Sequence, residues 1–64
     1  MHGTVREFDE ATGLGVIAAT DDAAFPFHCI EIADGTRTID AGQAVTFRLL
    51  PRFGAFQAGA IEKR

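Results

Sequence analysis

The sequence predicts an all-β protein, a small closed barrel of five short antiparallel strands. Apolar and polar residues alternate with a period of two in five segments, and no segment is long enough for a stable helix. A chain of 64 residues has room for one domain, residues 1–64. Closing the sheet into a barrel removes the exposed edges that would otherwise pair with other chains.

The first strand is expected over residues 2–8. Regular alternation places two sets of side chains on opposite faces, namely Thr4, Arg6 and Phe8 against Val5 and Glu7. A carboxylate that points into a core is costly. We therefore expect either a β-bulge in this strand or a Glu7 side chain that reaches water at the rim of the barrel.

The second and third strands follow short polar turns, the first of them over residues 9–13, and are expected over residues 14–19 and 23–28. Alternation places Gly13, Gly15 and Ile17 on one face of the second strand, and Leu14 and Val16 on the other. The glycines favour a barrel bend over a phosphate-binding loop, because no helix follows them. In the third strand Phe25 and Phe27 share a face, and Pro26 restricts the strand to a sheet edge or a bulge. The outward surface is expected to carry Leu14, Val16 and His28.

The second half of the chain is expected to contain one helical turn, a long loop and a final hairpin. The turn covers residues 29–33 and the loop residues 34–43. The fourth strand spans residues 44–50, with Val45, Phe47 and Leu49 inward, and is expected to stop at Pro51. A hairpin loop over residues 52–55 then leads to the fifth strand, residues 56–62.

Composition excludes several classes of protein. Cys29 is the single cysteine, so no internal disulfide can form, and Cys29, His28 and His2 do not make a zinc site. No metal, cofactor or catalytic constellation is expected, so the chain is not expected to be an enzyme. No apolar run reaches membrane-spanning length, and no signal peptide is evident, which favours a soluble cytoplasmic protein. The net charge of −3 means that any binding to phosphates depends on local placement of cations.

Several short motifs occur in a specific order along the chain. They are Gly3-x-Val5-x-x-Phe8, Gly13-x-Gly15-x-Ile17, Phe27-His28, Ile32, Asp40-x-Gly42-Gln43-x-Val45-x-Phe47 and Gln57-Ala58. This set resembles the bacterial cold-shock domain over nearly the whole chain. The resemblance implies an OB-type Greek-key barrel that binds single-stranded RNA or DNA on the face of its first three strands.

The chain departs from the family at the aromatic positions. The family motif Lys-Gly-Phe-Gly-Phe-Ile is here residues 12–17, in which Leu14 and Val16 replace both stacking phenylalanines. The motif Val-Phe-Val-His-Phe is here residues 25–29, which lack two more aromatics, and Glu7 replaces the tryptophan of Lys-Trp-Phe. Each stack of a base on an aromatic ring is worth about 1–3 kcal/mol, so we expect weak binding. Arg6, Phe8 and His28 keep the chemistry that the family implies.

The hairpin near the C-terminus offers a hypothetical substitute for the lost aromatics. Arg52, Phe53 and Phe56 lie within a segment where turns favour small polar residues. We expect Phe53 or Phe56 to stack on bases while Arg52 meets a phosphate. Two alternatives stay open: Phe56 caps the end of the barrel, or the aromatic pair binds a protein partner.

Two functions from different classes remain. The first is a monomeric RNA chaperone or gene-expression regulator that binds single strands weakly through Arg6, Phe8, Leu14, Val16, His28, Arg52, Phe53 and Phe56. The second is a cold-shock-like barrel that has lost this role and binds a protein partner through an exposed patch of Leu14, Val16 and Pro26.

Overall fold

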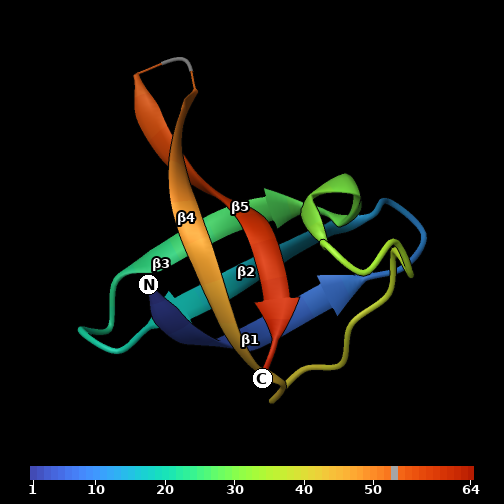
Figure 1. Ribbon diagram of the computed structural model, residues 1–64. Helices are drawn as coiled ribbons and strands as arrows, with labels where there is room; N and C mark the ends of the chain where they lie inside the picture. Colours follow the sequence, from blue (N-terminus) through green and yellow to red (C-terminus); the bar gives the residue numbers. More distant parts are fainter. Residues whose placement is uncertain (53) are drawn as a thin grey trace.

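The computed structural model describes residues 1–52 and 54–64, and its strands form a single antiparallel sheet (Figure 1). The elements are β1 (His2–Asp9), β2 (Leu14–Ala19), β3 (Ala24–His28), the 3-10 helix η1 (Cys29–Glu31), β4 (Ala44–Arg52) and β5 (Ala55–Lys63). The strand order is β3-β2-β1-β4-β5. A three-strand meander followed by a long return beside its first strand is a Greek key. The prediction of an all-β, five-stranded Greek-key barrel of the OB type is confirmed.

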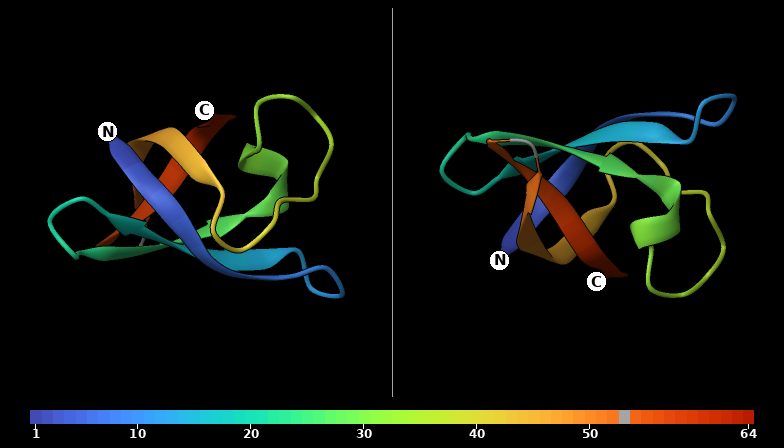
Figure 2. Two further views of the ribbon diagram at one scale, coloured as in Figure 1. Left: turned by 90° about the horizontal axis from the view of Figure 1, so that it is seen from below. Right: turned by 90° about the horizontal axis from the view of Figure 1, so that it is seen from above.

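The barrel closes where the end of the chain meets the segment that follows η1. Ile32 forms a parallel bridge with Ile61, and the Ala33 N–H donates a hydrogen bond of 2.7 Å to the Ile61 carbonyl. β5 also packs against β3, the outermost strand of the meander. Figure 2 shows β4 and β5 crossing the β1–β3 meander, which encloses the core between the two groups of strands.

Inward-facing side chains of all five strands make one core. The largest fully buried side chains are Phe27, Phe47, Ile17, Ile61, Val5 and Val45. Ile39 adds to this core from the long loop, which explains how a loop of that length stays attached to so small a barrel. Val45 and Phe47 are buried and Leu49 packs against the core, as the alternation in β4 predicted.

The two glycines of the first motif have different roles. Gly15 is a strand residue opposite both Phe8 and Phe27. A Cβ at this position would lie 2.5 Å from the Phe27 ring, so the close approach of the ring requires glycine. Gly13 instead has a φ of +75° and ends the β1–β2 turn, where the expected turn over residues 9–13 put it. The alternation that also placed Gly13 on the face of the second strand does not extend to it.

A β-bulge in β1 decides which side chains face outward. The register with β2 shifts between Val5 and Glu7, and Arg6 is the additional residue. Glu7 then pairs with Val16 on the outer face and is exposed, which confirms the expected bulge and the expected contact of Glu7 with water. The shift also turns Phe8 toward the core, so the prediction that Phe8 shares a face with Arg6 is wrong.

The fourth strand does not stop at Pro51. Pro51 pairs with Phe56, and β4 continues to Arg52. Proline is tolerated here because β1 pairs with β4 only at residues 44–46, so within the described part of the chain no strand pairs with the far side of β4 at Pro51 and needs its N–H. Pro26 is tolerated for the same reason, because it lies on β3, the outermost strand of the meander, and in the described sheet β3 pairs on one side only.

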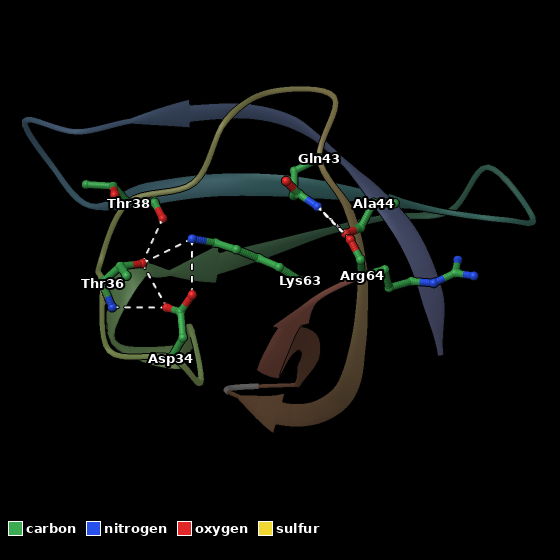
Figure 3. Close-up of polar contacts among 7 residues, drawn as sticks. All are labelled: Asp34, Thr36, Thr38, Gln43, Ala44, Lys63 and Arg64. Carbon is green, nitrogen blue, oxygen red and sulfur yellow. Dashed lines mark hydrogen bonds and ion pairs between the residues drawn. The ribbon is translucent and has the colours of Figure 1, made fainter.

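Polar contacts attach the long loop to the end of β5 (Figure 3). The Asp34 carboxylate lies 3.2 Å from the Lys63 ammonium and accepts hydrogen bonds from the Thr36 N–H and hydroxyl. The Thr36 hydrogen bonds, followed by the Lys63 contact, hold the pKa of Asp34 below its ordinary value of 3.8.

Among the described residues, no helix has the length and hydrophobicity needed to span a bilayer.

Candidate nucleic-acid interface

Strand register arranges the outer face of the meander in rows that run across β1, β2 and β3. Asp9, Leu14 and His28 form one row, since Leu14 pairs with both of the others. Glu7, Val16 and Pro26 form the next row in the same way. Leu14, Val16 and His28 were predicted to share the outward surface. The structure places Leu14 and Val16 on β2 and His28 on the adjacent strand β3.

These two rows border an open groove of about 570 Å³. The groove is lined by Glu7, Phe8, Asp9, Thr12, Leu14, Gly15, Val16, Pro26 and Phe27. Phe8 and Phe27 stack on each other with their ring centroids 5.9 Å apart and their planes 7° apart. Phe27 is buried, so Phe8 is the half-buried member of the pair and the one aromatic side chain of the lining with substantial exposure.

The exposed floor of the groove is aliphatic. Leu14 is 55% exposed, while Val16 is half-buried between Glu7 and Pro26. Such side chains can contact the flat face of a base, but they lack the π-system that makes aromatic stacking strong. The groove can therefore accept a planar apolar group and hold it weakly.

His28 stands at the end of β3 with one ring nitrogen already used. Its Nδ1 accepts a hydrogen bond of 3.3 Å from the Ile30 N–H, which caps η1. In the neutral ring the proton therefore lies on Nε2, which is left to donate to a phosphate or a base. His28 does not line the groove but lies directly beside Leu14.

The charges at the groove are negative. Glu7 and Asp9 both line it, and no Lys or Arg is among the lining residues. The Asp9 carboxylate accepts a hydrogen bond of 2.9 Å from the Ala11 N–H and so helps to fix the β1–β2 turn. Arg6 is exposed at the bulge, next to Glu7 in the chain.

Among the described residues, no group of His, Cys, Asp and Glu side chains is arranged to hold a metal.

The described hairpin residues Arg52 and Phe56 are not part of this groove. Arg52 and Phe56 are exposed near the tip of the β4–β5 hairpin, which projects beyond β3 at the end away from η1 (Figure 1). Phe56 is 56% exposed and lies outside the core, which argues against its capping the barrel. Phe53, the other aromatic of the hypothetical substitute platform, lies outside the described residues.

Sequence reasoning missed three residues of the lining with side chains that a ligand could contact: Glu7, Asp9 and Thr12. Glu7 was expected at the rim but was not counted as a site residue. Pro26 was expected on this outward face as part of a patch for a protein partner, because it is two residues before His28 and the period of two puts both on one face.

Comparison with known proteins identifies the class. The chain belongs to the cold-shock domain family: the family model described as the 'Cold-shock' DNA-binding domain matches residues 1–63. One similar solved structure is described as drosophila Unr CSD456, with 28% sequence identity and a TM-score of 0.81. The match covers 98% of this chain and 26% of that chain, so this chain corresponds to about a quarter of the solved one. None of the curated proteins gives a significant match. Family membership supports nucleic-acid binding of the cold-shock type.

Proposed function

We propose that this chain binds single-stranded RNA or DNA weakly through the outer face of β1–β3 and acts as an RNA chaperone or gene-expression regulator. The observation that carries the proposal is the register of the two rows, which brings Leu14, Val16 and His28 together beside an open groove. Bases would rest on Leu14 and Val16, and His28 Nε2 would donate to a phosphate or a base edge.

Weak binding follows from the chemistry of the face. Aliphatic floor residues forgo the aromatic stacks of about 1–3 kcal/mol each. The carboxylates of Glu7 and Asp9 repel the phosphate backbone. Along the chain, Arg6 is the described Arg or Lys residue nearest to the two rows, since it directly precedes Glu7. Because few cations can reach the phosphates of a bound strand, few counterions would be released on binding.

The test is a titration with a fluorescently labelled single-stranded oligonucleotide at several salt concentrations. One phosphate contact gives a slope of log K against log salt of about −0.7, and two contacts give about −1.4. We expect a slope in this range and a loss of affinity on His28→Ala. The proposal fails if no oligonucleotide binds, or if His28→Ala leaves the affinity of the folded protein unchanged.

A second function is favoured by one specific observation, the acidic lining of an apolar groove. Such a groove complements a protein segment that carries Lys or Arg beside apolar residues. This second function would be supported if the chain binds a peptide that contains lysine and leucine but does not bind oligonucleotides.

A further inference from the structure

Glu7 is an acidic residue on the outer face of the meander, beside apolar residues of β2 and β3. The bulge at Arg6 moves it from the core side of β1 to the outer face, in one row with Val16 and Pro26. It lines the same groove as these two residues. A base lying over Val16 and Pro26 would therefore have one of its edges directed toward the Glu7 carboxylate.

The Glu7 carboxylate is available to a ligand. Among the described residues, no hydrogen bond or ion pair engages it, whereas the other carboxylate of the groove, Asp9, is used by the turn that follows it. An ionised carboxylate is an acceptor with two oxygens and offers no donor. It selects a partner that presents two donors side by side.

We propose that Glu7 makes the groove prefer guanine, by accepting hydrogen bonds from its N1–H and its N2 amino group. Guanine is the one common base with two adjacent donors on its Watson–Crick edge. Adenine and cytosine each pair one donor with a neighbouring acceptor, and uracil holds a single donor between two carbonyls. In a single strand this edge is free to be bound. The inference rests on the proposed function, since it names the base class that the same face selects.

Glu7 affects affinity and selectivity in opposite ways. Its charge repels the phosphates of every strand to a similar extent, which lowers overall affinity without favouring any base. Its hydrogen bonds act on guanine alone. A good bidentate contact to a base edge favours the correct base over a wrong one by between about 5- and 150-fold in affinity. Because the groove is open to water, we expect Glu7 to favour guanine at the lower end of this range, about fivefold.

The experiment compares three fluorescent strands of about eight nucleotides: oligouridine, the same strand with one central guanosine, and the same strand with inosine, which lacks the N2 amino group. A single guanosine avoids guanine quadruplexes. The wild-type chain should bind the guanosine strand about fivefold more tightly than oligouridine, with the inosine strand between them. Glu7→Gln should bring the three affinities together and raise the affinity for oligouridine, since it removes the charge that repels the phosphates.

Glu10→Gln is the matched control. It removes the same charge from an exposed residue three positions along, which does not line the groove. It should keep the guanosine preference. The inference is overturned if the strands bind wild type equally, or if Glu7→Gln keeps the preference; the proposed function survives both results. If no strand binds at all, the proposed function and this inference fail together.

Discussion

Restoring one aromatic side chain to the outer face should strengthen binding of single strands. Leu14→Phe puts a ring at the edge of the groove, beside His28 and on a residue that is 55% exposed. Stacking on a base contributes about 1–3 kcal/mol relative to alanine. Leucine already supplies part of that contact, so we expect the gain to be about 1 kcal/mol, which is roughly a fivefold fall in Kd.

Fluorescence anisotropy with a labelled oligouridine measures this change. Thr46→Phe is the control, because Thr46 lies on β4 between His2 and Glu62, away from the groove. Thermal unfolding should change little for Leu14→Phe, since the replaced side chain is largely outside the core. Equal affinities of wild type and a folded Leu14→Phe variant would refute the reasoning, as would an equal gain from Thr46→Phe.

Three further predictions concern stability and the hairpin. Gly15→Ala should lower the free energy of unfolding in urea by about 1–3 kcal/mol, because its Cβ would lie 2.5 Å from the buried Phe27 ring; an unchanged urea midpoint would contradict this. Phe56→Ala should leave stability within about 0.5 kcal/mol of wild type, since Phe56 is 56% exposed, and a large fall in the melting temperature would restore the capping explanation. Asp34→Asn should destabilise the protein at neutral pH, because it weakens the two Thr36 hydrogen bonds to the carboxylate and removes the Lys63 contact. Because folding lowers the pKa of Asp34 below 3.8, its contribution is present above that pH and is lost as the pH falls through the folded-state value, so the urea midpoints of variant and wild type should converge in acid.

Much of the fold could be predicted from the sequence because the alternation of apolar and polar residues is local information. Val45 and Phe47 show this, since both are buried as their spacing requires. Phe8 shows the limit. Its face depends on a bulge two residues earlier, and the position of the bulge is set by pairing with β2 rather than by the residues of β1.

The candidate site was predicted in part for the same reason. The outward orientation of Leu14 and Val16 follows from alternation within one strand, and the family resemblance indicated a binding role for His28. The place of Glu7 in the groove also needs the register between strands, which no local pattern supplies. Phe56 was linked to the nucleic-acid face because the hairpin segment is rich in aromatic residues, but Phe56 is exposed near the start of β5 and is not among the residues that line the groove.

The central claim is that the outer face of β1–β3 binds single strands, and an NMR titration of the nitrogen-labelled chain with oligouridine tests it most directly. We predict that the amide signals of Glu7, Leu14, Val16 and His28 move progressively with added strand, while those of Thr36 and Lys63 at the loop–β5 contact stay in place. Shifts confined to residues outside the two rows, or no shifts at low salt, would contradict the claim.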